Sequence, residues 1–227
     1  MVNAPRGSNP TPWYRALFDA TQMQNAAWNS LVVAVWTTVI SSVLGTAAAL
    51  GIARSKSAWV KGWDMVFMSP LVLPALAFGF AALIYLYQMG LRPSLVFLIL
   101  GHVVVCVPFV IRMTLAALTQ LDPALLDASE SLGAGGWMTF RRVTLPLSLP
   151  GVIAGCTLTF AACVTAFVTH TLIGGARLVY MPYHIYSQAV GANNWPFAAA
   201  LSVVFMIAVM MVIALLGRLS AMSRVHD

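Results

Sequence analysis

Charged side chains are scarce in this 227-residue sequence: they make up 8% of the residues, whereas hydrophobic residues make up 60%. A soluble domain carries about a quarter of its residues as charged side chains. With a mean hydropathy of +0.87, the chain has too little polar material to cover a surface that faces water. The composition therefore excludes an ordinary soluble protein and indicates one compact membrane domain.

Cysteine and histidine are also few, and neither forms a metal-binding pattern. Cys106, Cys156 and Cys163 have neither zinc nor disulfide spacing, so we interpret them as small apolar packing residues. His102 and His170 lie well inside apolar stretches, where ionisable side chains are candidates for function. One histidine deep in the third predicted span and another near the end of a span do not make a metal site, and we predict no bound metal ion.

Catalytic and nucleotide-binding motifs are missing as well. The sequence has no Gly-x-x-x-x-Gly-Lys-Ser/Thr phosphate loop, no His-Glu-x-x-His and no Gly-x-Ser-x-Gly. We therefore predict that the chain is not an enzyme and binds no cofactor. A secondary transporter or channel remains an alternative class, although such proteins usually place more ionisable residues inside their spans.

Long stretches without Asp, Glu, Lys or Arg divide the chain into membrane spans. A helix needs about 20 mostly apolar residues to cross the hydrocarbon core, and the stretches lack the alternation of half-buried strands. They predict an all-α polytopic bundle of five transmembrane helices, near 28–52, 65–88, 94–116, 150–172 and 196–217.

The basic residues predict the orientation of these spans, because cytoplasmic loops collect Lys and Arg. One set of alternating loops carries eight of them: Arg54, Lys56, Lys61, Arg112, Arg141, Arg142, Arg218 and Arg224. The other set carries Arg6, Arg15, Arg92 and Arg177. We expect residues 1–26 on the periplasmic side of the inner membrane and the tail 218–227 in the cytoplasm. Since loop charges account for much of the net charge of +6, we expect no nucleic-acid partner.

The longest polar interruption, at about 118–149, is predicted to hold two short amphipathic helices on the cytoplasmic face. Asp122-Pro123 is typical of a helix start, and Gly133 of a helix end. Leu125, Ala128 and Leu132 share one face of the first helix. The second stretch, 137–143, is expected to end before Pro146 and Pro150, which open the next span. Either a helix lying on lipid headgroups or a docking element for a partner fits this pattern.

The residue spacing in this loop adds a specific resemblance. Asp127-Ala128-Ser129 is followed by three residues, Gly133, nine residues and Val143-Thr144-Leu145-Pro146. This pattern resembles the EAA loop of binding-protein-dependent ABC importer permeases, which reads Glu-Ala-Ala, three residues, Gly, nine residues and Ile-x-Leu-Pro. Every spacing agrees, and the three departures (Asp for Glu, Ser for Ala, Val for Ile) are conservative.

The resemblance implies a type I, MetI-like permease domain over 27–217. A coupling helix at about 123–133 would sit in a cleft of a separate ATPase subunit. The other implied partners are a second ATPase subunit, an identical or homologous second permease, a periplasmic solute-binding protein and membrane lipid. The residues carried over for coupling are Asp127, Ala128, Ser129, Gly133, Val143, Leu145 and Pro146.

Residues 28–34 resemble the start of the conserved core of these permeases. Residues 166–169, 172–175 and 194–197 resemble the spermidine/putrescine branch, which also includes related opine and phosphonate importers. Members of this branch usually have six helices, and the five predicted here match the last five. Residues 14–24 look like the outside segment that follows the missing helix, so we expect a late start or a shortened product. The implied substrate is a small polar solute such as a polyamine or an opine.

Candidates for the substrate path are few. Pro74 can kink the second span, and Thr159, Thr165 and Thr169 either line a polar pore or bond back to their own helix. No Asp or Glu lies inside a predicted span, so we expect the binding protein to select the substrate. Four aromatic residues on the outer side form an aromatic belt or contact that protein: Tyr180, Tyr183, Tyr186 and Trp195.

Overall fold

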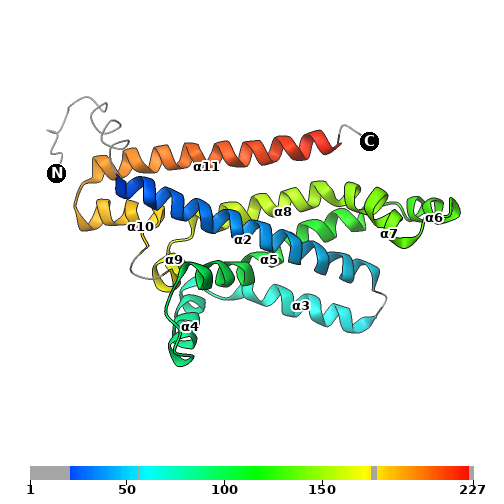
Figure 1. Ribbon diagram of the computed structural model, residues 1–227, viewed down its shortest axis with the longest axis horizontal. Coiled ribbons are helices and arrows are strands. Elements are labelled where there is room, and N and C mark those ends of the chain that lie inside the picture. Colours follow the sequence, from blue (N-terminus) through cyan, green and yellow to red (C-terminus); the bar gives the residue numbers. More distant parts are fainter. Residues whose placement is uncertain (1–20, 56, 175–177, 225–227) are drawn as a thin grey trace.

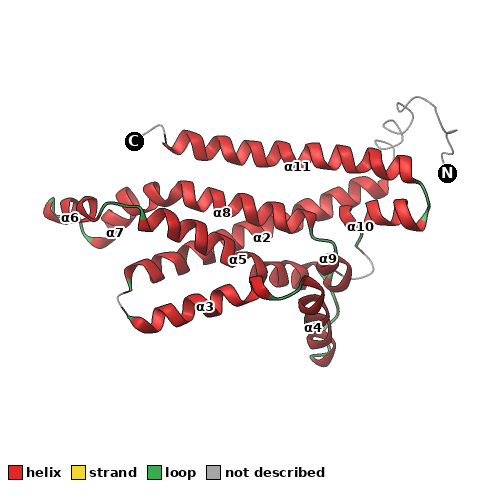
Figure 2. Cartoon of the chain, turned by 180° about the vertical axis from the view of Figure 1, so that it is seen from behind, coloured by secondary structure: helices red, strands yellow, loops and turns green. Residues whose placement is uncertain are grey.

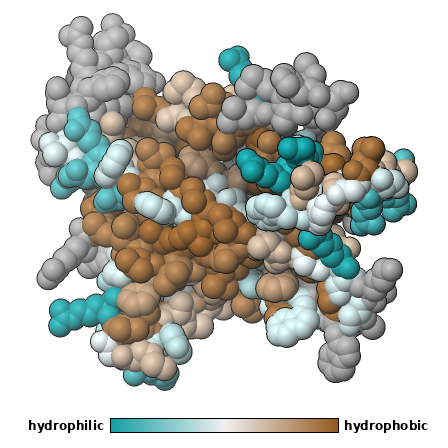
Figure 3. All heavy atoms as spheres, turned by 45° about the vertical axis from the view of Figure 1, so that its right-hand side comes forward, coloured by the Kyte–Doolittle hydropathy of each residue, from teal (hydrophilic) through white to brown (hydrophobic). Residues whose placement is uncertain are grey.

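The computed structural model describes residues 21–55, 57–174 and 178–224 (Figure 1). Within these ranges every regular element is a helix, which confirms the all-α prediction. The expectations for residues 1–20, for Arg177 and for the last three residues lie outside the described residues. The space-filling view has a broad hydrophobic area over the middle of its face, with hydrophilic residues mainly toward the margins (Figure 3).

Four long helical segments run along the molecule and are apolar and long enough to cross a membrane. They are α2 (Thr21–Arg54), α5 (Leu95–Thr119), the continuous segment 136–165, and α11 (Trp195–Arg224). The segment 136–165 consists of α7 (Gly136–Thr139), a π-helical turn η1 (Phe140–Thr144) and α8 (Leu145–Thr165). With one bent helix pair counted as a span, the described residues hold the five spans that the sequence predicts.

Two glycines allow α2 and α8 to pack closely on α5. A Cβ atom added to Gly45 of α2 would lie 2.6 Å from Cβ of Val110, and one added to Gly155 of α8 would lie 2.7 Å from Cα of Val110. Val110 is fully buried at this contact. Gly155 thus serves close helix packing, as its small-xxx-small pairing with Gly151 indicates.

The prediction of one uninterrupted helix over 65–88 is wrong. The chain forms α3 (Ala58–Val72) and α4 (Ala75–Gln88), and Met65–Val72 is bent by 103° from Ala75–Gln88. Pro74 precedes α4 with ψ of 131°, outside the helical region. A proline has no N–H to continue the helix and keeps the residue before it out of the helical conformation, so the helix stops. Figure 1 shows α4 directed away from the long axis.

The expected stop before Pro146 and Pro150 is also wrong, because the helix continues through both. Pro146 falls in the first turn of α8, where the lost N–H matters least. The wider π-helical turn η1 comes directly before α8. The span then ends at Thr165 rather than near 172, because Ala166 is extended with ψ of 125°.

The short helices lie at opposite ends of the bundle (Figures 1 and 2). At one end, α6 (Pro123–Ser131) lies beside α7. Near the other end are α9 (Val168–Ile173), α10 (Met181–Tyr186) and the π-helical turn η2 (Ser187–Gly191). The long helices join these two ends of the bundle.

Replacing Gly155 with Ala should destabilise the bundle, because the added Cβ meets the backbone of α5. Overpacking of this kind typically costs about 1–3 kcal/mol. The measurement is the thermal unfolding of the full chain in detergent. Gly51→Ala is the matched control, since a Cβ at Gly51 of α2 meets nothing within 4 Å and alanine favours helix. Equal melting temperatures for the two variants would contradict the packing described here.

Candidate coupling surface

The helix α6 begins and ends as the sequence indicates. Oδ1 of Asp122 accepts a hydrogen bond of 2.9 Å from the backbone N–H of Ala124, and Pro123 is the first helical residue. At the other end Gly133 has φ of +77°, which favours glycine. The N–H of Gly133 donates to the carbonyl of Glu130, and the N–H of Ala134 to that of Ser129. This pair of bonds is a Schellman motif, so the helix end is fixed by its own backbone.

A side-chain hydrogen bond joins α6 to the helix that continues into the membrane. Oγ of Ser129 and Oγ1 of Thr139 are 2.8 Å apart, and Thr139 is buried. Ser129 is the third residue of the Asp-Ala-Ser motif, and Thr139 is the last residue of α7. The sequence reasoning missed Thr139, because a single threonine ten residues away gives no periodic signal. The bond ties the coupling motif mechanically to α7, η1 and α8.

The outer face of this region is apolar and exposed. Leu132 is 88% exposed, Trp137 73%, and Leu125 and Met138 each 47%. A shallow cavity of about 380 Å³ lies between α6 and η1; it is lined by Leu125, Ala128, Ser129, Leu132, Ala134, Met138, Arg142 and Val143. Exposed apolar patches of this kind indicate interaction sites. We call this surface, with exposed Asp127, the coupling surface.

The second half of the motif consists of Val143, Leu145 and Pro146, and only Val143 reaches the coupling surface. Val143 lines the cavity, so the structure brings it together with Ala128 and Ser129. Leu145 and Pro146 lie in the first turn of α8 and do not line the cavity. They form the start of the span α8.

At the opposite end, a buried polar cluster ties α9 to α5. His102 Nε2 and Thr169 Oγ1 are 3.0 Å apart, and His102 Nδ1 lies 3.0 Å from the carbonyl oxygen of Leu98. A carbonyl only accepts, so a neutral His102 carries its proton on Nδ1 and accepts from the Thr169 hydroxyl at Nε2. The ring of His170 lies 4.9 Å from that of His102 and 4.7 Å from that of Tyr180, centroid to centroid. Sequence reasoning singled out both histidines but not their contact.

The candidate path residues do not converge on one site. Thr159 is fully buried and donates to the carbonyl of Cys106 on α5 at 3.4 Å. Thr165 is exposed and donates within its own helix to the carbonyl of Ala161. Pro74 stands at the break between α3 and α4, and Thr169 belongs to the cluster at His102.

The aromatic residues near α10 are less uniform than expected. Tyr183, Tyr186 and Trp195 are exposed and suit either a membrane belt or a partner contact. For Tyr180 both interpretations are wrong, because its side chain is only 1% exposed and stacks on His170.

The comparisons with known proteins agree with this fold. Residues 41–222 match the family of binding-protein-dependent transport system inner membrane components, and the chain belongs to that family. It is accordingly a permease subunit of an ABC importer, as predicted.

Among curated relatives, the spermidine/putrescine permease protein PotC of Escherichia coli (strain K12) is 27% identical over 208 residues, which are 90% of this chain and 77% of PotC. The inner membrane ABC transporter permease protein YdcU of the same strain is 32% identical over 216 residues, 93% of this chain and 65% of YdcU.

Solved structures share the fold at lower identity. A chain of a bacterial ABC transporter that imports alginate superposes with a TM-score of 0.80 at 16% identity, covering 95% of this chain and 85% of that one. A chain of the MetNI methionine ABC transporter, in an inward-facing conformation, gives a TM-score of 0.75 at 19% identity, covering 95% and 99%. These likenesses confirm the expected MetI-like permease fold.

Removing the hydrogen bond between Ser129 and Thr139 should loosen α6. Ser129→Ala deletes one partner, and the net loss for such a bond is about 1 kcal/mol. Amide hydrogen exchange of residues 123–133 should become about fivefold faster. Ser131→Ala is the control in the same helix, because Ser131 donates only to the carbonyl of Asp127 within α6. Equal exchange in the two variants would show that α6 is not held through Thr139.

Proposed function

We propose that α6 and the coupling surface dock in a cleft of a separate ATPase subunit and transmit its motion to the membrane bundle. The observation that supports this proposal is the exposed apolar face of α6. The helix α6 ends at Gly133, and the hydrogen bond between Ser129 and Thr139 ties it to α7. A helix that only rested on lipid headgroups would not need a fixed attachment to a transmembrane span. Asp127, Ala128, Ser129, Gly133 and Val143 are the residues assigned to docking, with Leu145 and Pro146 behind them.

The path of the motion follows the continuous helix. A displacement of α6 acts on Thr139, then on η1, and then on α8, which packs on α5 and α2. The π-helical turn η1 interrupts the regular α-helical pattern of that helix, because each of its hydrogen bonds joins residues five apart instead of four. Binding of ATP to the partner then biases the bundle between two states, as an effector at a distant site does.

The proposed assembly contains two ATPase subunits, a second permease subunit that is identical or homologous, a periplasmic solute-binding protein and membrane lipid. One solved relative is an alginate transporter in complex with a periplasmic protein, which supports this kind of assembly. The sequence of this chain has no phosphate loop, so we assign ATP hydrolysis to the partner and no cofactor to this chain.

We assign the end that bears α6 to the cytoplasm of the bacterium. Arg54 ends α2, Arg141 and Arg142 lie in η1, and Arg218 lies in the last turns of α11, so these basic residues follow the long helices toward one end. The side that collects Lys and Arg is the cytoplasmic one. The first turn of α2 then lies on the periplasmic side, and so does the helix α10.

The proposed substrate is a small polar solute of the polyamine or opine kind. The similarity to PotC supports this assignment. The helices α2, α4, α5, α8 and α11 carry no Asp or Glu, so we assign the recognition of a cation mainly to the binding protein. Pro74, Thr159, Thr165 and Thr169 stay candidates for the path, and Thr165 is the exposed threonine among them.

The test uses the backbone requirement at Gly133. Its φ of +77° is unfavourable for any residue with a Cβ, by about 1–2 kcal/mol, and most of all for a β-branched one. Gly133→Val should therefore reduce substrate uptake and co-purification of the ATPase about tenfold, while membrane insertion is unchanged. Gly133→Asn should retain more activity, since asparagine tolerates this conformation.

Gly135→Val is the matched control, because Gly135 has φ of −67° and open space around its Cβ position. It should leave uptake and ATPase binding near the wild-type level. Full uptake with Gly133→Val, or an equal loss with Gly135→Val, would sink the assignment of α6 as the coupling helix.

A further inference from the structure

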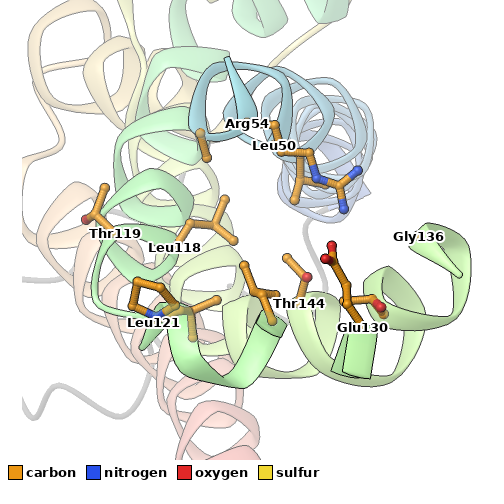
Figure 4. Close-up of a pocket in the computed structure, with 12 residues that line it drawn as sticks. Leu50, Arg54, Leu118, Thr119, Leu121, Glu130, Gly136 and Thr144 are labelled. Carbon is orange, nitrogen blue, oxygen red and sulfur yellow. The ribbon is translucent and has the colours of Figure 1, made fainter. Parts of the chain in front are cut away.

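A second cavity, of about 520 Å³, lies behind α6 (Figure 4). It lies between the end of α2, the end of α5, the inner side of α6 and the segment 136–144. Its volume is in the range of small-ligand sites. Arg54 and Glu130, which line it, are exposed, so the cavity opens to the surface. None of the coupling motif residues 127–129 lines it.

Two opposite charges face each other across this cavity. The guanidinium of Arg54, from α2, and the carboxylate of Glu130, from α6, point toward one another (Figure 4). The two groups do not reach ion-pair distance of each other in the described structure. The Cζ atom of Arg54 lies 5.8 Å from the centroid of the Phe140 ring, within the range of a cation–π contact. The guanidinium is thus held at the cavity by a contact other than Glu130.

The remaining walls are mainly apolar. The cavity is lined by Leu50 from α2, Leu118 from the end of α5, Leu121 from the turn after α5, and Leu126 from α6. α2 and α5 are membrane spans, and the cavity lies where they end. Membrane lipid is therefore a class of ligand that can reach the cavity, at the ends of these two spans.

We propose that this cavity binds the phosphoethanolamine headgroup of a membrane phospholipid. Arg54 would hold the phosphate, since guanidinium matches phosphate geometry and is weakly hydrated. Glu130 would accept hydrogen bonds from the primary ammonium. The leucines would contact the glycerol and the first methylene groups, which is why a lipid fits better than a free zwitterion. The headgroup would then bridge α2 and α6.

The test measures lipid retention by the full chain, purified in detergent and examined by native mass spectrometry. Phosphatidylethanolamine, phosphatidylcholine and phosphatidylglycerol are added in turn. Phosphatidylethanolamine should be retained best, because phosphatidylcholine has no N–H donor and phosphatidylglycerol has no cation. Glu130→Gln should lower the retention of phosphatidylethanolamine about tenfold, as the loss of one charge-assisted bond predicts, and leave phosphatidylglycerol unchanged. Arg54→Gln should lower both.

The controls are Asp127→Asn, a carboxylate on the same helix outside the cavity, and Arg92→Gln, before the other end of α5. Both should retain phosphatidylethanolamine as the wild type does, and added free phosphoethanolamine should not displace the lipid. Equal retention of the three lipids, or equal loss in Glu130→Gln and Asp127→Asn, would overturn the proposal. Displacement by free phosphoethanolamine at micromolar concentration would also overturn it, because the leucines would then contribute nothing.

Discussion

The attachment of α6 to the segment 136–165 is the constraint on which the rest of the structure depends. Ser129 and Thr139 make the contact, and Gly133 ends α6 with φ of +77°. The helix that holds Thr139 continues through η1 into α8, past two prolines. Without this attachment, α6 would be an amphipathic helix next to a membrane bundle. With it, the exposed apolar face of α6 and the buried packing of α8 on α5 belong to one mechanical element.

The two ends of the bundle use different physical means to hold their short helices. At the α6 end, backbone capping and one hydroxyl pair fix a helix that is otherwise exposed. At the other end, α9 is fixed by buried polar contacts with α5, through His102 and Thr169. Polar partners of this kind are needed where no water can satisfy a buried ring nitrogen. Between these ends, Gly45 and Gly155 at Val110 let α2 and α8 pack closely on α5.

Local rules predicted the local features well. Asp122, Pro123 and Gly133 mark the ends of α6 through capping and backbone preferences that depend on neighbouring residues alone. The effect of a proline depends on more than its neighbours. Pro74 stands at a helix break, whereas Pro146 falls in the first turn of α8 and Pro150 lies inside that helix without ending it. The contact of His102 with Thr169 spans 67 residues, and a single sequence carries no periodic signal for it.

The most direct measurement of the central claim is the accessibility of Leu132, at the exposed end of α6. In a chain whose three cysteines are replaced by alanine, Leu132→Cys is treated with a membrane-impermeant maleimide. The account predicts labelling in inside-out vesicles without the ATPase, protection when the ATPase is bound, and none in intact spheroplasts, whereas Tyr186→Cys near α10 shows the reverse sidedness. Labelling of Leu132→Cys in intact spheroplasts would contradict the account, because no cytoplasmic ATPase could then reach α6.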